Sequence, residues 1–403
     1  MAIFVGPTSG IKTAMFAGGG TTGAFVGLST TTTGRNAGVG TITGAIIYNE
    51  TDSAMQYYNG TTWRDVTSPF SATGGNIANG LEPGNGYAYH TFTSSGSLVV
   101  QGGNKTSCEC LVVGGGGGGG ASNYTGSDGG AGGGAGGLAW GSAITITPGT
   151  YNIVVGTGGA GGIDATSSSQ PGCANKPQPY SGTQGTNGVD SVFGASSPTG
   201  MKITAKGGGG GGSGPNAGNA DCGGSGGGGG GGGAATADVG GATNQPTANP
   251  GYSYTLNVYG NPGGQGPTNP EFTGGGGGGA AGPGGNGGSG GPAKGGGSQP
   301  LPAIWSMPVI GQPAWNPYSG QFAAGGSGGR QTNNAPTNSA DSMKPSGTGG
   351  GNGATCNGNA GNGYDGTGGG GGGGAGSGCP TFANPKRNGG TGGLGLVVFR
   401  YPV

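Results

Sequence analysis

CECLVVGGGGGGGASNYTGSDGGAGGGAGG, residues 108–137, runs a short apolar strand directly into seven consecutive glycines. The residues Glu109–Val113 can contribute to a core, but glycine has no side chain to bury, and fixing its backbone costs on the order of 1–2 kcal/mol per residue. Blocks of the same kind recur at 207–212, 226–233, 274–279 and 368–374. The fold therefore depends on what the glycine blocks do.

The composition excludes several classes of protein. Glycine accounts for 118 of 403 residues, and Leu, Ile, Val and Phe together make up only about 12%, too little for a large conventional core. The 13 basic residues balance 13 acidic ones, and charged residues are 6% of the chain, so charge repulsion does not hold it open. Without clustered Lys and Arg, we expect no binding to nucleic acid or anionic lipid.

Sequence pattern also argues against collagen, a membrane span and a secretory signal. The glycines come in blocks without a strict Gly-X-Y period. No apolar run reaches the length of a membrane span, and residues 1–16, MAIFVGPTSGIKTAMF, lack the basic start and continuous apolar stretch of a signal peptide. We expect no membrane insertion, and a protein that stays in its cell or leaves by a route such as lysis at the end of a viral cycle.

Two conformations are open to the glycine blocks. They could be flexible linkers, or polyglycine II helices with three residues per turn and a rise of about 3.1 Å per residue. Polyglycine II helices can pack side by side because no Cβ keeps them apart. Matched block lengths of six to eight residues favour a bundle in which every amide needs a partner. We predict that the amides of Gly114–Gly120 pair with other glycine blocks, and that Leu111–Val113 lies beside Leu396–Phe399.

Residues 1–70 read as short β elements. Strands are predicted at Ala45–Tyr48, Met55–Tyr58 and around Trp63. Asn59-Gly60 between the last two is a strong hairpin signal, since both central residues of such a turn need positive φ. The unit is too small to bury both faces, so we expect it to pack on copies of itself.

A linker at 71–85 is expected to lead into a second region, 86–403. Strands are predicted within 86–113, at 143–155, where Pro148-Gly149 forms a turn, and at 394–401. The predicted fold class is mainly β with an irregular glycine-rich region: a small N-terminal β module followed by a β-anchored polyglycine II bundle, without substantial α-helix.

Two resemblances to known families follow from these residues. Ile47-Tyr48-Asn49, Tyr58-Asn59-Gly60 and Trp63 resemble a short β motif of bacteriophage tail-fibre and other virion proteins. The segments YHTFTSSGSLVV, LVVGGGGGGG, GSAITITPGTYNIVVGTGGAGG and GGTGGLGLVVFRY resemble a glycine-rich domain of marine bacteriophages and some bacteria, over residues 86–403. About 165–365 is matched only through its glycine blocks.

The resemblance implies a virion structural protein of the tail-fibre or adhesin type, located on the particle surface. It also implies a packed polyglycine II sandwich like that of some phage adhesins. Residues 1–70 would attach to other virion proteins and associate with copies of themselves, as a homotrimer. The alternatives are a capsid or tail decoration without a specific receptor, and a cellular extracellular adhesion protein.

Residues for catalysis are scarce. His90 is the sole histidine and lies on a predicted strand beside Tyr89 and Phe92, where a structural role is expected. The glycine blocks match G-x-G-x-x-G everywhere but never lead into G-K-[ST], so no phosphate loop is predicted. The carboxylates are scattered, without a paired motif. We expect no enzymatic activity, no cofactor and no metal site.

Six cysteines leave two possibilities open. Cys108, Cys110, Cys173, Cys222, Cys356 and Cys379 could form three disulfides in 15 ways or remain reduced. Cys108 and Cys110 share one face of a predicted strand and are poorly placed to bridge each other. The absence of a C-x-x-C pair disfavours zinc.

Large aromatic side chains lie in the segments between glycine blocks. One role for them is receptor binding at the tip of the bundle, where they would stack on a host glycan or bind an outer-membrane protein. The other is packing among themselves or between subunits. The candidate receptor-binding residues are Tyr252, Tyr254, Tyr259, Trp305, Trp315, Tyr318 and Phe322.

Overall fold

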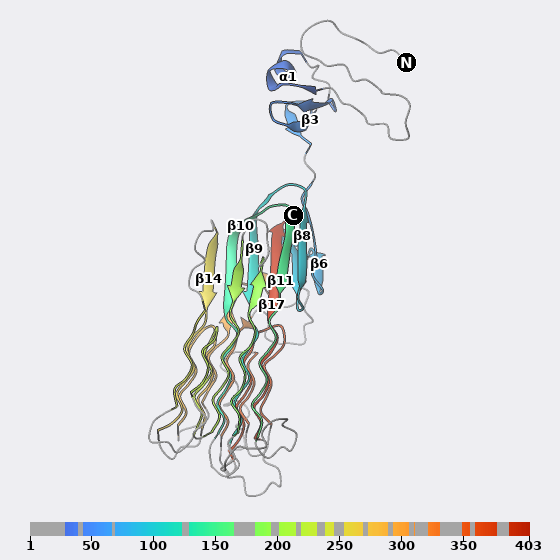
Figure 1. Ribbon diagram of the computed structural model, residues 1–403. Helices are drawn as coiled ribbons and strands as arrows, with labels where there is room; N and C mark the ends of the chain where they lie inside the picture. The colour runs from blue at the N-terminus through green and yellow to red at the C-terminus, as the bar shows by residue number, and fades with distance from the viewer. Residues whose placement is uncertain are drawn as a thin grey trace, which may run out of the picture. The chain divides into compact units, whose positions relative to one another are not determined.

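The computed structural model is mainly β, with one short α-helix among the residues that it describes (Figure 1). It divides into two compact units: unit 1 comprises Met1–Phe70 with Gln101–Gly103, and unit 2 comprises Ser71–Val100 with Asn104–Val403. The structure describes residues 29–38, 43–66, 69–122, 129–164, 182–194, 201–214, 219–231, 238–245, 254–268, 273–288, 293–305, 310, 321–330, 349–354, 359–376 and 387–403.

Unit 1 is a four-stranded sheet with a helix against one face. Strand order is β1-β2-β3-β4, with β1 parallel to β2 and the other pairs antiparallel. The elements are β1 (Ser29–Thr30), α1 (Thr32–Gly38), β2 (Ile46–Asn49), β3 (Ala54–Tyr58) and β4 (Trp63–Asp65). The three predicted strands are present. The sequence did not predict α1, which begins where the Thr31 hydroxyl accepts the amide of Gly34 (3.1 Å).

The hairpin between β3 and β4 forms where Asn59-Gly60 predicted it, with a different turn. Gly60 has φ of +100°, and Asn59 is not among the residues with positive φ. Instead, the Asn59 side chain accepts the amides of Thr61 (3.0 Å) and Thr62 (2.8 Å). The longer loop is therefore held by a side chain rather than by two left-handed residues.

Unit 2 begins with two facing sheets. One has the order β14-β10-β9-β17-β7-β6 and the other β13-β12-β11-β8-β5, while β15 and β16 form a separate pair. The strands are β5 (Ser71–Thr73), β6 (Ala78–Leu81), β7 (Tyr87–Phe92), β8 (Gly96–Gln101), β9 (Lys105–Val113), β10 (Leu138–Ile146), β11 (Gly149–Val154), β12 (Ser191–Phe193), β13 (Ile203–Ala205), β14 (Thr255–Tyr259), β15 (Gln299–Pro300), β16 (Gln321–Phe322) and β17 (Leu396–Pro402).

The predicted linker at 71–85 differs from the structure. β5 joins the five-stranded sheet and β6 the six-stranded sheet, so these residues belong to unit 2. The sequence signal was weak because both strands are short, and β6 contains Gly80 with φ of +77°. β7 and β8, adjacent in sequence, enter different sheets.

The C-terminal strand β17 lies in the middle of the six-stranded sheet. It pairs with β9 through Leu396↔Val113 and Val398↔Leu111, which confirms the predicted pairing. On one face Phe399 stacks on Phe193 of the opposite sheet, with ring centroids 5.6 Å apart. On the other face Leu396 and Val398 join a buried cluster with Trp305 and Phe322. Apolar side chains of β17 thus pack on both faces of this sheet.

Beyond the sheets, the glycine segments form a bundle of parallel and antiparallel rods (Figure 1). The rod 114–122 lies inside it. The amides of Gly114, Gly117 and Gly120 donate to the rod 129–137, those of Gly115 and Gly118 to 182–190, and those of Gly116 and Gly119 to 387–395. Every amide of Gly114–Gly120 is therefore paired, as predicted. The period of three residues is that of polyglycine II.

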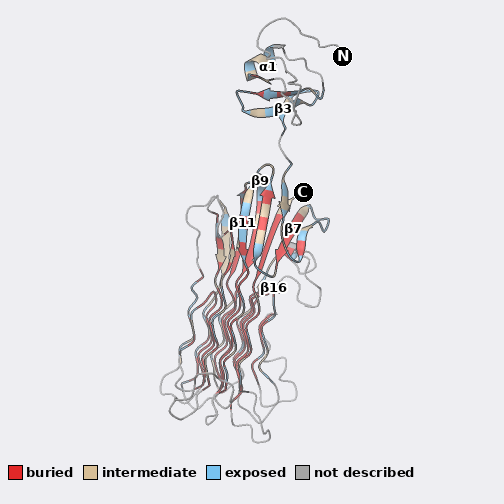
Figure 2. Ribbon diagram, turned by 45° about the vertical axis from the view of Figure 1, so that its right-hand side comes forward, coloured by how far each residue is buried: buried red, intermediate tan, exposed pale blue. Residues whose placement is uncertain are grey.

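The carbonyls of the same rod are paired in a matching way. Those of Gly115–Gly120 accept from three further rods, 206–214, 155–164 and 368–376, again with a period of three. The central rod therefore has six hydrogen-bonded neighbours, and buried residues run along the rods as they do through the sheets (Figure 2). Two of the neighbours contain the predicted blocks 207–212 and 368–374. The other four are rods in which residues with side chains interrupt the glycines.

Outer rods keep glycine only where they face the bundle. In the rod 155–164, Thr157, Ala160 and Ile163 are exposed, three residues apart, while Gly156, Gly159 and Gly162 face neighbouring backbones. These rods were not predicted from the sequence, because only uninterrupted runs of glycine were taken as polyglycine II segments. The informative pattern is a three-residue period with one exposed position, since Gly158 and Gly161 also face neighbouring backbones.

Polar side chains close the lateral edges of the bundle by accepting backbone amides. They also repeat every third residue: Asn187 and Asp190 accept the amides of Gly210 (2.7 Å) and Gly207 (2.9 Å). Similar pairs are Thr183 with Ile163, Thr186 with Ala160, Asn362 with Thr391, and Asp365 with Leu394. Side-chain oxygens thus replace the carbonyls that a further rod would supply.

Candidate functional site

The aromatic candidates within the described residues lie at the sheet end of the bundle. Trp305 ends a short 3-10 helix, Ala303–Trp305, and its ring meets those of Trp140 (6.2 Å) and Tyr89 (6.5 Å) edge-on. Trp305 and Phe322 are fully buried. The structure therefore corrects the receptor-binding expectation for these two residues. They pack within the protein, which is the alternative that the sequence left open.

The tyrosines of the second candidate segment are half-buried. Tyr259, the last residue of β14, pairs with Leu138 of β10 and packs against the cluster containing Trp305. The Tyr254 hydroxyl donates to the carbonyl of Lys202 (3.2 Å). Tyr252, Trp315 and Tyr318 lie outside the described residues, and their predicted role stays a prediction.

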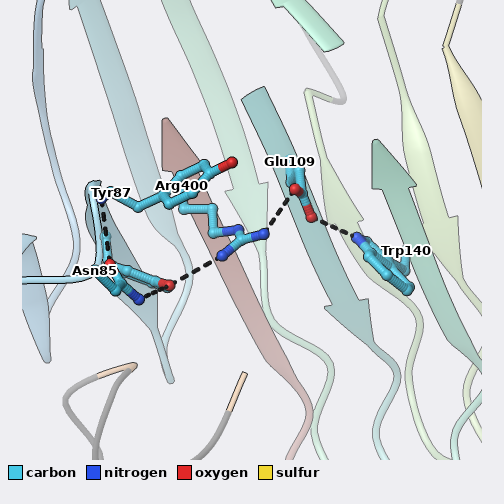
Figure 3. A network of polar contacts seen from close by, with 6 residues as sticks. Asn85, Tyr87, Glu109, Trp140 and Arg400 are labelled. Atoms are coloured by element: carbon cyan, nitrogen blue, oxygen red, sulfur yellow. Dashed lines mark hydrogen bonds and ion pairs between the residues drawn. The ribbon is translucent and has the colours of Figure 1, made fainter. Parts of the chain in front are cut away.

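A buried polar network holds this aromatic cluster in place (Figure 3). Arg400 of β17 is 2% exposed, and its guanidinium donates to Glu109 (2.6 Å) and to the Tyr89 hydroxyl (3.1 Å). Glu109 also accepts the indole N–H of Trp140 (3.0 Å). Strands β17, β9, β7 and β10 are thereby connected through one ion pair.

Arg400 is also enclosed by aromatic rings. Its guanidinium carbon lies 4.1 Å from the centroid of Tyr87 and 4.7 Å from that of Trp305. A planar guanidinium can stack on rings and donate in its own plane at once, which an ammonium cannot. Arg400 and Glu109 were not singled out from the sequence. Arg400 lies two residues from Val398 and Glu109 two residues from Leu111, so on paired strands they share a face that is otherwise apolar, and this was the available signal.

His90, Cys108 and Cys110 are also buried within unit 2. His90 is buried, and its Nδ1 lies 2.7 Å from the Gly74 carbonyl. Burial lowers the pKa of His90, and the hydrogen bond to Gly74 opposes this in part. Cys108 and Cys110 are free and buried, and burial raises the pKa of Cys108 to about 12 and that of Cys110 well above its usual range. Cys222 is free and exposed. Cys173, Cys356 and Cys379 lie outside the described residues.

The described part of the chain shows no candidate metal site and no candidate membrane-spanning helix. It contains no group of three His, Cys, Asp or Glu residues placed to hold a metal ion. Within the same residues, no helix has the length and apolar character needed to cross a bilayer.

The end of the bundle away from the sheets is the other candidate surface. At this end the amide of Gly120 donates to Ala131 and that of Ala121 to Thr183. The rods that end at Ser122 and Asp164 therefore stop beside the rods that begin at Gly129 and Gly182. A buried ion pair, Arg387 with Asp164 (3.2 Å), lies at this end. We call the end of the bundle away from the sheets the free end.

The arrangement is suited to presenting surface segments on a rigid support. A rod fixed by hydrogen bonds to six neighbours has little freedom to bend, so the points at which the chain enters and leaves the rods are held in place. The connecting segments 123–128, 165–181, 215–218 and 377–386 join rods at the free end and lie outside the described residues.

Comparison with protein families gives a match over most of the chain. No curated protein matches the chain. The glycine-rich domain family matches residues 93–402, which include the facing sheets and the whole bundle apart from the first strands. The chain therefore belongs to the glycine-rich domain family.

Proposed function

We propose that the protein is a bacteriophage virion structural protein, a tail fibre or adhesin that binds the host surface without catalysing a reaction. The observation that carries the proposal is the complete pairing of the Gly114–Gly120 amides within the bundle. Such a bundle is stiff, presents few side chains internally and ends in a set of connecting segments. These are properties of a support for binding loops rather than of an enzyme.

The receptor-binding surface belongs at the free end of the bundle. The buried Trp305 and Phe322 are unsuited to it, and Tyr254 and Tyr259 lie at the sheet end. The free-end segments are rich in Asn, Ser, Thr and Pro, as in 165–181, ATSSSQPGCANKPQPYS. Side chains of this kind suit a host glycan or the exterior of an outer-membrane protein. A rigid support reduces the entropy lost when such loops bind.

Unit 1 supplies the second half of the proposal. Its sheet attaches the chain to other virion proteins and associates with copies of itself, so that several bundles act on one surface. The sequence predicts a homotrimer for this association. Several copies increase avidity without any new contact.

Binding and adsorption measurements test the function. Fluorescently labelled full-length protein should bind cells of the host strain and compete with phage adsorption. Replacing 165–181 by a Gly-Ser segment of equal length should abolish both effects, whereas Val154→Ser, at an exposed residue of β11, should leave them intact. Antibody labelling of particles should place the protein on the tail.

Each part of the result is informative. Protein that neither binds host cells nor reduces adsorption, although it is found on particles, overturns the adhesin and leaves a decoration protein. Absence from purified particles overturns the virion assignment altogether.

A further inference from the structure

Unit 1 has an apolar face open to solvent and a polar face covered by its helix. The exposed face carries Ile46 and Tyr48 of β2 and Met55 and Tyr57 of β3, which are 54%, 41%, 47% and 39% exposed. They form two direct cross-strand pairs, Ile46↔Tyr57 and Tyr48↔Met55. A sheet with one solvated face ordinarily shows the reverse pattern, with polar residues outside.

The covered face is stabilised mainly by hydrogen bonds. Asn49 and Gln56 are buried, and the Asn49 amide donates to Gln56 (3.0 Å) and to Asp52 (2.7 Å). Gln56 donates to Asp65 (2.7 Å) and accepts from Arg35 of α1 (2.5 Å). Among the described residues of unit 1, Ile47 is the one large apolar side chain in the core. This unit therefore gains little from apolar burial alone, and small units of this kind commonly need oligomerisation.

The exposed residues form a self-complementary pattern. On the rectangle made by the two cross-strand pairs, Tyr48 and Tyr57 occupy one diagonal, and Ile46 and Met55 occupy the other. A second copy can lie face to face with the first, related by a twofold axis that runs parallel to the strands midway between the two sheets. Each tyrosine ring then lies over Ile46 or Met55 of the other copy. Rings on aliphatic side chains interdigitate well, and Met sulfur makes favourable contacts with aromatic rings.

Charge and composition favour a second copy over a charged partner. Among the described residues, charged side chains stand only at the margins of the patch: Arg64 pairs with Tyr57 across β3 and β4, and Glu50 accepts a hydrogen bond (2.9 Å) from Ser29, the partner of Tyr48 on β1. Aromatic residues, Met and Arg are enriched at protein interfaces. A single patch that matches itself generates a twofold, isologous contact, whereas a threefold ring needs two different patches.

We propose that the face formed by Ile46, Tyr48, Met55 and Tyr57 joins two copies of unit 1 face to face about a twofold axis. This deepens the self-association in the proposed function, and it replaces the trimer predicted from sequence by a pair. The contact brings two glycine-rich bundles into one assembly, joined through unit 1 of each chain.

Sedimentation equilibrium of the full-length protein tests the stoichiometry. We expect a mass of two chains at micromolar concentration. The double variant Tyr48→Ser/Tyr57→Ser should weaken association by at least about tenfold, since buried interface tyrosines often contribute this much each. The matched control Tyr364→Ser, at a tyrosine of unit 2 that is 48% exposed, should leave it unchanged.

Methionine oxidation supplies a readout on the unaltered protein. Met55 should react with hydrogen peroxide more slowly as protein concentration rises through the dissociation constant, as followed by peptide mass spectrometry. A monomer at all concentrations, a three-chain mass, or a pair unaffected by the tyrosine changes would overturn the proposal. So would Met55 that is protected equally at all concentrations, which would mean that the chain covers this face itself. None of these outcomes bears on host binding by unit 2, which the adsorption assay measures separately.

Discussion

A Cβ atom added to Gly117 would overlap the carbonyl oxygen of Gly209, a residue of the neighbouring rod. The same backbone positions are held by hydrogen bonds, since Gly117 donates to Gly134 (2.8 Å) and accepts from Gly371 (2.9 Å). A rod inside the bundle therefore has no direction in which it can move away from an added methyl group. Glycine is required here for close approach of backbones.

Gly117→Ala should therefore destabilise the protein strongly. Overpacking in a core that can adjust costs about 1–3 kcal/mol, and we expect the upper end or more here because the clashing atom is backbone. The control is Gly282→Ala, where an added Cβ meets nothing within 4 Å and φ is not positive. Thermal denaturation followed by circular dichroism compares the two. Equal melting temperatures would contradict the close packing of the rods.

Arg400→Met should cost about 3–5 kcal/mol of stability, because it leaves Glu109 buried without its cation. The side chains of this pair are 3% and 14% exposed. Lys206→Met is the matched control, since the pair Lys206–Asp190 has the same kind of contact (2.8 Å) but is 38% exposed on both sides, and breaking it should cost about 0–1 kcal/mol.

Chemical denaturation measures both changes, and Arg400→Lys adds a test of the ring contacts. Lysine keeps the charge but loses the second donor and the stacking on Tyr87, so it should rescue only part of the loss. Full rescue by lysine would show that charge alone matters at this position.

Asn362→Ala should remove an edge contact of the bundle at a cost of about 0.5–1.5 kcal/mol. The Asn362 side chain accepts the amide of Thr391 at 3.0 Å, and alanine offers that amide only water. Asn362→Asp keeps the acceptor and should restore most of the loss. Hydrogen exchange at the Thr391 amide supplies the local readout: it should accelerate in the alanine variant and stay slow in the aspartate variant. Unchanged exchange would mean that Asn362 does not close this edge.

The sequence predicted the parts of the fold that depend on local signals. Leu111–Val113 and Leu396–Phe399 are continuous apolar runs, and such runs in a chain poor in apolar residues have few partners other than each other. The rods at 155–164 and 182–190 were not predicted, because their glycines are spaced rather than continuous. That spacing becomes meaningful only once the threefold geometry of the rods is known.

The site was harder to predict than the scaffold. Aromatic residues between glycine blocks can lie at either end of a bundle, and the sequence does not say which. Trp305 is buried by contacts with Trp140 and Tyr89, which are distant in sequence. The apolar face of unit 1 was implied only by its small size, since the alternation of Ile46 and Tyr48 with Ile47 and Asn49 does not reveal which side the helix covers.

The single histidine makes the acid response of this protein interpretable. Because Nδ1 of His90 lies 2.7 Å from the Gly74 carbonyl, it carries the proton and donates it, and Nε2 is buried without a hydrogen-bond partner. The ring also stacks on Tyr401, with centroids 5.8 Å apart. Protonation at Nε2 would place a charge where no acceptor is available, in agreement with the lowered pKa.

The direction of the pH effect follows from that lowered pKa. Below the ordinary histidine pKa of about 6.5 the unfolded chain takes up a proton that the folded protein resists, so the free energy of unfolding decreases as pH falls, by at most about 1.4 kcal/mol per pH unit. Above about pH 7 the effect is absent. His90→Asn keeps a donor for Gly74 and cannot titrate, so its stability should decrease less between pH 6.5 and 5 than that of the unaltered protein. Urea denaturation across this range measures the difference, and parallel curves for the two proteins would show that His90 becomes protonated in the folded state without cost.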